Sequence, residues 1–442
     1  MVFKSKKIIR NMENTILIGL NELNFDFIKY YIKQGKLPNF KKLFELNKII
    51  ETESEEDYKL LEPWIQWATI HTGKSYEEHQ IFRLGDISEK TDVEQIFEKL
   101  ESLGKTIGAV SPFNAENRLK DAKFFIPDPW TKTKASGNWV VKGLYEAVRQ
   151  SVNDNAKGSL KKSTIITLII AIVLYVPITR YSHYFKLFLR RKKPAVKAII
   201  LDSLLSDVFI ALNKRSKPDF SNLFLNSGAH IQHHYLFNST AYKGNFKNPE
   251  WYCPEGSDPL IEILTEYDSV IERLQKTPSK IIIATGLHQQ PHNHLTYYWR
   301  INEHHNFIKK IGINSFEELL PRMSRDFLVS FKTIEETSIA EELLSSFLME
   351  KDNKPVFVVD NRGKSLFVEL IYADDIDDVD LIYSHDKSIK VAEFKRYISF
   401  VAIKNGEHNG IGYLTSNFDL NLKKEKINLT EVRGIIESHV IK

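Results

Sequence analysis

Histidine residues that follow expected strands are the first candidates for chemistry in this chain. Three of them occur within five positions, directly after an apolar run at 219–226: His230, His233 and His234. Another, His408, lies in the segment NGEHNGIGYL, and His288 follows the apolar run SKIIIAT. Imidazole is a common zinc ligand and the side chain that most often transfers protons near neutral pH. These residues indicate a metal or acid–base site, although a polar helix surface is the simpler explanation for any single one.

A polar pair follows the first expected strand. The apolar run Thr15–Leu20 predicts a buried parallel strand, and Asn21 and Glu22 come directly after it. Active sites of open α/β sheets lie at the carboxyl ends of the strands. We therefore take Glu22, together with His288, as a candidate catalytic residue and Asn21 as a candidate substrate contact.

The stretch LEPWIQWATIHTGKSYEEH at 61–79 predicts a turn that starts a short aromatic helix. Free backbone N–H groups at a helix start suit an anion, which makes Trp64 and Gln66 candidate substrate contacts. The alternative is a core helix with Trp64 and Trp67 buried.

Two arginines three residues apart, Arg322 and Arg325, are placed at a probable helix start. Arginine pairs suit bidentate recognition of phosphate or carboxylate, so both are candidate substrate contacts. A surface salt-bridge cluster with Asp326 is the commoner explanation.

Three of these pieces, at 16–44, 61–79 and 405–414, resemble in this order the alkaline phosphatase superfamily, in its phosphodiesterase-like and sulfatase-like branch. The matching motifs are a first strand followed by a helix and the turn GKLPN, a helix closing with Thr-Gly, and a final Gly-x-His segment. The resemblance implies an α/β fold with a mostly parallel central sheet, helices on both faces and an inserted helical cap. It also implies chemistry on phosphate or sulfate esters with two divalent ions.

The chain departs from the family pattern at one of the two ion sites. Asn21 stands where the family has a metal-binding Asp, and Pro63 stands where it has a Thr or Ser nucleophile. Gly286 and Leu287 replace the Asp and His of a further metal motif. An amide brings no charge to a divalent ion, and proline has no hydroxyl group with which to attack phosphorus or sulfur. We therefore expect the first ion site to be lost.

The second ion site could persist on imidazoles alone, which favours zinc. The family's Asp-x-x-x-His falls on Ala229 and His233 in one alignment and on His230 and His234 in another. His408 matches the final metal histidine in both cases. The expected ligands are therefore taken from His230, His233, His234 and His408.

The segment 137–217 divides the expected core into 1–136 and 218–442 as a helical insert. Its apolar part, 165–178, would span only about 21 Å as a helix, whereas the hydrocarbon core of a bilayer is about 30 Å thick. Basic residues flank this run on both sides. Attachment to a membrane surface through 163–194 and a buried cap helix are equal alternatives, and a true span is the third.

Composition limits the partners and the compartment. The net charge of +4 gives no case for nucleic acid, and the single cysteine, Cys253, excludes an internal disulfide. The basic N-terminus lacks the apolar run of a cleavable signal peptide. We expect a cytoplasmic protein, and a peripheral position at the inner face of the membrane is the alternative that attachment through 163–194 would imply.

The function that these observations favour is a divergent metal-dependent hydrolase or transferase of phosphate or sulfate esters. A weaker resemblance to bacterial relatives from surface-polysaccharide gene clusters suggests a glycan or lipid-linked glycan substrate. The alternatives are a catalytically inactive relative that binds a sugar or anionic ligand, and a membrane-proximal scaffold.

Overall fold

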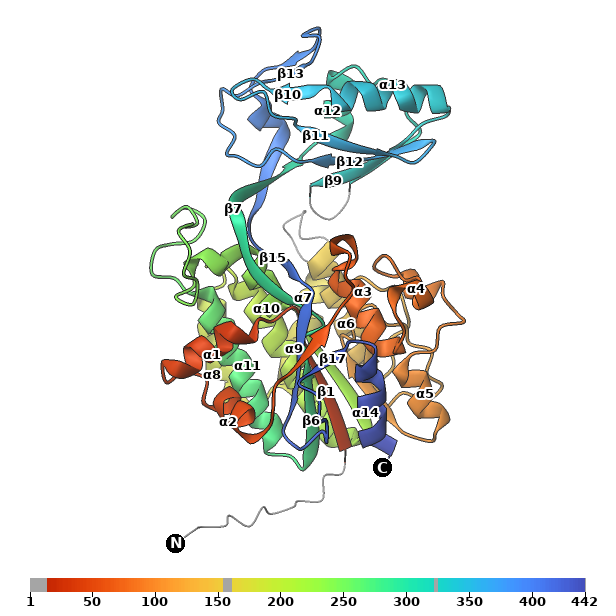
Figure 1. The fold of residues 1–442 in the computed structure, drawn as a ribbon, viewed down its shortest axis with the longest axis vertical. Coiled ribbons are helices and arrows are strands. Elements are labelled where there is room, and N and C mark those ends of the chain that lie inside the picture. Colours follow the sequence, from red (N-terminus) through yellow and green to blue (C-terminus); the bar gives the residue numbers. More distant parts are fainter. Residues whose placement is uncertain (1–13, 154–160, 322–324, 442) are drawn as a thin grey trace. The chain divides into compact units, whose positions relative to one another are not determined.

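A computed structural model describes residues 14–153, 161–321 and 325–441. The chain divides into two compact units (Figure 1). The first unit comprises the described residues up to Gly244, Pro249–Pro291 and those from Gly406 on, and the second comprises Asn245–Asn248 and His292–Asn405.

An eight-stranded sheet forms the centre of the first unit. Its order is β17 (Lys426–Asn428), β2 (Ile50–Glu53), β16 (Ile411–Ser416), β6 (Ser279–Ala284), β1 (Asn14–Leu20), β5 (Phe220–Leu225), β3 (Ile107–Val110) and β4 (Phe124–Ile126). Every neighbouring pair is parallel except the two pairs made by β16. The mostly parallel central sheet that the sequence predicts is therefore confirmed.

Helices cover both faces of this sheet because its strands are apolar on both sides. Ile16 and Ile18 of β1 belong to one buried cluster and Leu17 to another. The first cluster includes α1 (Phe25–Lys33), α2 (Pro38–Leu46), α6 (Trp139–Asn153), α7 (Lys162–Tyr175), α8 (Tyr181–Leu189), α9 (Val196–Ser216), α10 (Ser227–Tyr235) and α11 (Pro259–Gln275). The second includes α3 (Pro63–Thr72), α5 (Ile96–Ser102) and α14 (Glu431–Ile441).

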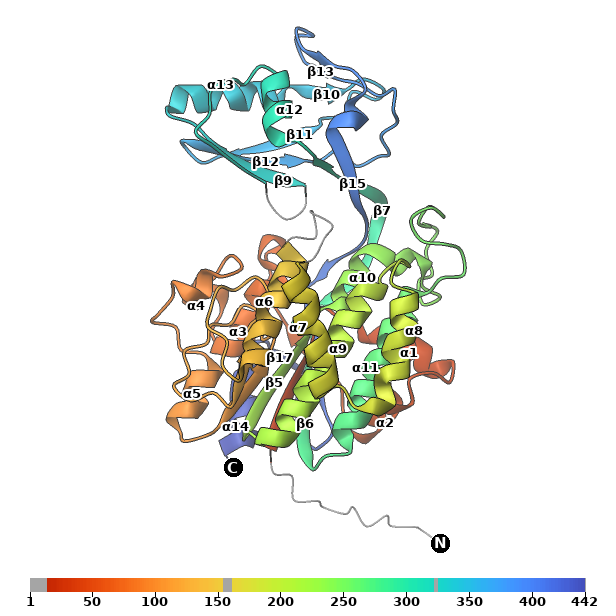
Figure 2. The same ribbon diagram turned by 180° about the vertical axis from the view of Figure 1, so that it is seen from behind.

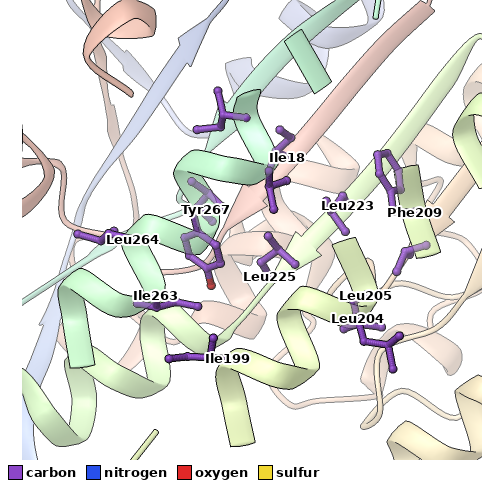
Figure 3. Close-up of a cluster of buried hydrophobic side chains, with 14 of the residues drawn as sticks. Ile18, Ile199, Leu204, Leu205, Phe209, Leu223, Leu225, Ile263, Leu264 and Tyr267 are labelled. Carbon is purple, nitrogen blue, oxygen red and sulfur yellow. The ribbon is translucent and has the colours of Figure 1, made fainter. Parts of the chain in front are cut away.

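Figure 3 shows part of the first cluster, where Ile18 and Leu223 meet helix side chains such as Phe209 and Tyr267. The helices of 137–217 pack in this cluster as part of the first unit. Among the described residues, no helix is both long and apolar enough to cross a membrane.

The register of the three central strands brings their carboxyl ends together. Leu20 of β1 pairs with Leu225 of β5, and Gly19 pairs with Ala284 of β6. The residues that follow β1, β5 and β6 therefore share one edge of the sheet, which is where the candidate site is formed.

The second unit contains an antiparallel sheet in the order β11 (Phe357–Asn361), β12 (Ser365–Leu370), β9 (Asp326–Ser330) and β8 (Glu318–Pro321). A smaller sheet has the order β10 (Phe347–Met349), β13 (Ile382–Ser384) and β14 (Lys390–Val391), and the helices are α12 (His304–Lys310) and α13 (Ile334–Ser345). The chain enters and leaves this unit through the paired strands β7 (His288–Ile301) and β15 (Ile398–Asn409). The segment 218–442, which was expected to be one part of the core, contains most of this second unit.

Candidate functional site

The backbone of Glu22 is held at the junction of β1, β6 and α10. Its φ of +55° lies in the left-handed region, which is uncommon for residues other than glycine. The Glu22 N–H donates to the Thr285 carbonyl over 3.0 Å, and the Glu22 carbonyl accepts from Gln289 N and Gln232 Nε2, each over 3.0 Å. These bonds hold the Glu22 backbone in place, and the residue is only 2% exposed.

Two imidazoles converge on the Glu22 carboxylate. His233 Nε2 lies 2.9 Å from Glu22 Oε2, and His408 Nε2 lies 3.1 Å from the same oxygen. The three side chains each offer one ligand atom, and these atoms all lie within 4.8 Å of one another. We call Glu22, His233 and His408 the carboxylate–imidazole cluster. Within the described ranges it is the one group of this kind that could hold a metal ion.

Further polar groups orient the members of this cluster. Asn21 Nδ2 donates to Glu22 Oε1 over 2.8 Å, and Gln289 Nε2 donates to Glu22 Oε2. On the far side of the imidazole, His408 Nδ1 lies 3.8 Å from Glu62 Oε2. A carboxylate near the second nitrogen of a histidine is a common arrangement in metal sites, since it orients the ring and raises its basicity.

The electrostatics of the cluster favour an ionised carboxylate. Burial by itself would raise the pKa of Glu22, but the charges and hydrogen bonds of His233 and His408 more than reverse this effect. The pKa of Glu22 therefore lies well below its usual value. A buried carboxylate that stays negative can attract a cation.

Local sequence explains how the two histidines reach Glu22. His233 lies on α10, which starts directly after β5, and the preceding Gln232 binds the Asn24 N–H and the Glu22 carbonyl. His408 lies on β15, where Gly406 permits a close approach. A Cβ atom at Gly406 would lie 2.8 Å from the Gln232 carbonyl oxygen and would also meet the Gln289 side chain.

The adjoining part of the edge is built from amides and an indole. Trp67 Nε1 donates to Asn21 Oδ1 over 2.8 Å, and Asn21 Nδ2 donates to Asn226 Oδ1 over 2.7 Å. We call Asn21, Trp67 and Asn226 the amide–indole cluster. Asn226 directly follows β5 and was missed by sequence reasoning, although its position matches that of Asn21 after β1.

Trp67 also fills the space beside Gly286. A Cβ atom at Gly286 would lie 3.2 Å from Trp67 Nε1, and Gly286 has a φ of +74°. Pro63 is the first residue of α3 and offers no hydroxyl group. The positions that the resemblance assigns to the first ion thus carry no charged ligand.

The other histidines considered in the sequence analysis lie outside the carboxylate–imidazole cluster. The rings of His230 and His234 contact each other, with centroids 4.9 Å apart, and it is His233 that reaches Glu22. The expectation of an all-imidazole site is therefore corrected, because a carboxylate lies between the two histidines. His288 Nδ1 hydrogen-bonds with the Ile411 carbonyl over 2.6 Å, so its ring is held away from the cluster.

The expected substrate contacts have local partners. Trp64 Nε1 donates to the Phe82 carbonyl over 2.9 Å, and Gln66 is fully buried with its Nε2 donating to the Leu60 carbonyl over 2.7 Å. Arg325 belongs to the second unit, where it pairs with Glu369 over 2.5 Å and lies over the Tyr298 ring. It directly precedes the strand β9 rather than starting a helix, because 326–330 alternates buried and partly exposed residues. Arg322 lies outside the described residues.

Comparison with known proteins finds no matching family model and no matching curated protein. Similar solved structures include phosphonoacetate hydrolase from Sinorhizobium meliloti 1021, which is 11% identical, with 98% of this chain and 96% of that chain covered and a TM-score of 0.45. Human ectonucleotide pyrophosphatase/phosphodiesterase 5 is 10% identical, with coverage of 97% and 94% and a TM-score of 0.41. A mutant of alkaline phosphatase PafA is 11% identical, with coverage of 98% and 96% and a TM-score of 0.47. All three are members of the alkaline phosphatase superfamily.

Proposed function

We propose that the carboxylate–imidazole cluster binds one divalent cation, with zinc favoured, and that the protein is a hydrolase of phosphate or sulfate esters. The convergence of Glu22, His233 and His408 at the carboxyl edge of the sheet carries this proposal. The extension to esters of surface or lipid-linked glycans rests on the sequence resemblance.

The donor set fits the proposed ion. Two imidazole nitrogens and one carboxylate oxygen are the ligands of a catalytic zinc site with one open position. Glu22 is held by Asn21 and Gln289, and Glu62 lies near the second nitrogen of His408. Such outer contacts keep ligands in place before the ion arrives.

The chemistry follows from these groups. A cation held there would supply Lewis acidity, which lowers the pKa of water and polarises a phosphoryl or sulfuryl oxygen. Pro63 at the start of α3 provides no nucleophilic oxygen, so a covalent ester on this turn is not expected. Direct attack by water is the route that these residues support, with Glu62 orienting the His408 ring.

The amide–indole cluster favours a second candidate function. Trp67 fills the neighbouring half of the edge, and no hydroxyl group stands at Pro63. These two features suit a protein that has kept one ion to bind an anionic or sugar ligand without turnover.

The decisive experiment compares wild type with His408→Ala and with His234→Ala, a matched control that removes a histidine outside the cluster. After purification with zinc, mass spectrometry should find about one ion per chain in wild type and control and almost none in His408→Ala. Absence of metal in wild type would overturn the proposed site.

Hydrolysis of 4-nitrophenyl phosphate, bis(4-nitrophenyl) phosphate and 4-nitrophenyl sulfate then separates the two functions. Zinc-dependent turnover that His408→Ala abolishes supports the hydrolase. Stoichiometric zinc without turnover of any of the three esters, combined with saturable binding of phosphate or sulfate, supports the binding protein.

A further inference from the structure

Exposed apolar side chains are concentrated on two neighbouring helices of the first unit. Of the 23 large hydrophobic residues that are exposed in the described chain, ten fall within residues 165–189. They are Ile165, Ile166, Ile169, Val173, Leu174, Ile178, Tyr181, Phe185, Phe188 and Leu189. We call these ten residues the α7–α8 patch. Exposed hydrophobic residues that are scattered singly need no explanation, whereas a concentration of them on one face of a protein indicates an interaction surface.

Helix α8 exposes more large apolar side chains than an ordinary surface helix does. Its outward side chains include Phe185, Phe188 and Leu189, which are 63%, 56% and 63% exposed. A helix on a water-exposed surface places its apolar face inward and its charged face outward. Here these three large apolar side chains are directed away from the core, while Tyr184 and Leu187 pack into it.

Polar residues of α8 and its flanks are directed inward instead. Arg180 pairs with Asp207 of α9 over 2.9 Å, and Tyr184 donates to the same carboxylate over 2.7 Å. His183 lies 3.0 Å from Glu266 of α11, and Arg190 pairs with Glu262 of that helix over 2.6 Å.

These contacts fix the rotation of α8. Since breaking a buried ion pair leaves an uncompensated charge, they hold the apolar side chains outward. The exposure of these side chains is therefore enforced by specific contacts.

The outer face of α7 is also apolar. Ile165, Ile169 and Val173 recur every four residues and are exposed, whereas Ala171 and Tyr175 are buried. Ala171 and Tyr175 belong to the same buried cluster as Tyr184 of α8. The two helices thus cover the same face of the sheet, and Figure 2 shows them on either side of α9.

The charge around the patch identifies its partner. Residues 161–201 contain nine lysines and arginines and no aspartate or glutamate. At the end of α8, Lys186, Arg191, Lys192 and Lys193 are exposed, and the Arg191 guanidinium lies 4.2 Å from the centre of the Phe188 ring. Exposed cations beside apolar side chains fit anionic lipid headgroups above the acyl chains.

We propose that the α7–α8 patch docks the protein on the surface of an anionic lipid bilayer, with both helices lying in the headgroup region. A second copy of this chain suits the patch less well, because a symmetric dimer would bring two basic clusters of like charge together. This inference does not depend on the proposed function.

Flotation with vesicles tests the proposal. The vesicles contain phosphatidylcholine with about one third phosphatidylglycerol, and pure phosphatidylcholine vesicles serve for comparison. The test variant is Phe185→Ser/Phe188→Ser/Leu189→Ser, and the control is Ile334→Ser/Ile339→Ser/Val379→Ser, which changes exposed apolar residues of the second unit. Wild type and control should float with anionic vesicles, and the test variant should partition at least about tenfold less.

A charge variant distinguishes docking on anionic lipid from non-specific adhesion of the apolar side chains. Lys192→Glu/Lys193→Glu should weaken binding to anionic vesicles about tenfold and should change binding to neutral vesicles much less. Unchanged far-UV circular dichroism and zinc content would show that the variants are folded and that the metal site is intact.

Three results would overturn the proposal. The first is that the wild-type protein does not float with anionic vesicles. The second is that wild type and the α8 triple variant partition equally. The third is that the patch controls self-association instead of vesicle binding. In the last case, sedimentation would show a wild-type dimer that the α8 variant converts to monomer without any vesicle binding.

Discussion

Two neighbouring halves of one sheet edge differ in what they can hold. The carboxylate–imidazole cluster contains an ionised carboxylate between two imidazoles. The amide–indole cluster beside it contains neutral side chains only. Asn21 joins the two, because its Nδ2 donates both to Glu22 and to Asn226. One edge of an α/β sheet can therefore contain possible ion ligands in one half and tightly packed neutral side chains in the other.

The filled half depends on small residues around Trp67. A Cβ atom at Gly19 would lie 2.6 Å from Trp67 Cη2, and one at Gly286 would lie 3.2 Å from Trp67 Nε1. The indole therefore needs glycine at position 19, and it packs tightly against Gly286. This half of the edge thus lacks charged ligands, and Trp67 fills the space in which an ion would be held.

The largest expected effect comes from emptying the filled half. Trp67→Ala should lower the free energy of unfolding by about 3–5 kcal/mol, since it removes a fully buried ring and leaves a cavity. Trp67→Phe keeps most of the ring and loses the bond to Asn21, so its cost should be smaller. Urea denaturation measures both changes.

Zinc content of the same variants tests the comparison itself. Both should bind as much zinc as wild type, because the carboxylate–imidazole cluster does not include Trp67. A second equivalent of zinc in Trp67→Ala would show that the neighbouring half still holds an ion site.

The next effect concerns pH and a buried imidazole of the filled half. His71 contacts the Trp67 and Phe97 rings, and burial lowers its pKa from 6.5 to about 3. The unfolded chain then binds a proton more readily than the folded chain, so stability is complete above about pH 6.5 and decreases as the pH falls toward 3. Between about pH 6.5 and 4.5, His71 should lower the free energy of unfolding by about 2 kcal/mol.

The measurement is the unfolding free energy of wild type and His71→Phe across this pH range. The variant should show the weaker pH dependence, because phenylalanine cannot take up the proton. Parallel curves would exclude His71 as the titrating group.

Asn21→Asp should produce a moderate change, because it replaces the joining amide by a carboxylate. The variant loses the two hydrogen bonds donated by Nδ2 and places a second negative charge beside Glu22. We expect a loss of about 1–3 kcal/mol without metal and a larger stabilisation by added zinc than wild type shows.

Asn226→Asp is the matched control. The aspartate side chain keeps an acceptor for Asn21 Nδ2, so this substitution should lower the free energy of unfolding less than Asn21→Asp does. Thermal unfolding with and without zinc compares the two variants. Equal stabilities of wild type and Asn21→Asp in the absence of metal would contradict the assigned bonds.

The smallest expected effect lies in the ion-binding half. Glu62→Gln removes the charge 3.8 Å from His408 Nδ1, and its zinc affinity should fall about tenfold. Glu77→Gln, at an exposed position of the short helix after α3, should leave the affinity unchanged. Competition with a zinc chelator measures both, and equal affinities of the two variants would remove Glu62 from the site.

Much of the core was predictable because apolar runs and polar residues after them are local signals. The runs at 15–20 and 219–226 became β1 and β5, and Glu22 and His408 lie at the predicted edge. The choice between His230, His233 and His234 was not predictable, since it depends on how α10 is rotated against β1. Asn226 was passed over because the alignments placed the second ligand motif on Ala229 or His230.

Other errors came from strands that pair over long distances. His288 was taken as a candidate catalytic residue, but it starts β7, and that geometry directs its ring to the Ile411 carbonyl. Arg325 was expected at a helix start, but pairing of β9 with β8 and β12 makes the segment after it a strand. Antiparallel partners of this kind are set by tertiary contacts that a single sequence does not reveal.

The position of β16 has a consequence for synthesis of the chain. This strand lies inside the central sheet, between β2 and β6, yet it is made after the whole second unit. Until residue 416 leaves the ribosome, β6 therefore presents an open edge, β2 lacks its inner neighbour, and His408 cannot reach Glu22. Chains truncated after residue 405 should thus be digested rapidly at 50–53 by proteases, whereas slow digestion there would show that the first unit matures before β16 and β17 are added.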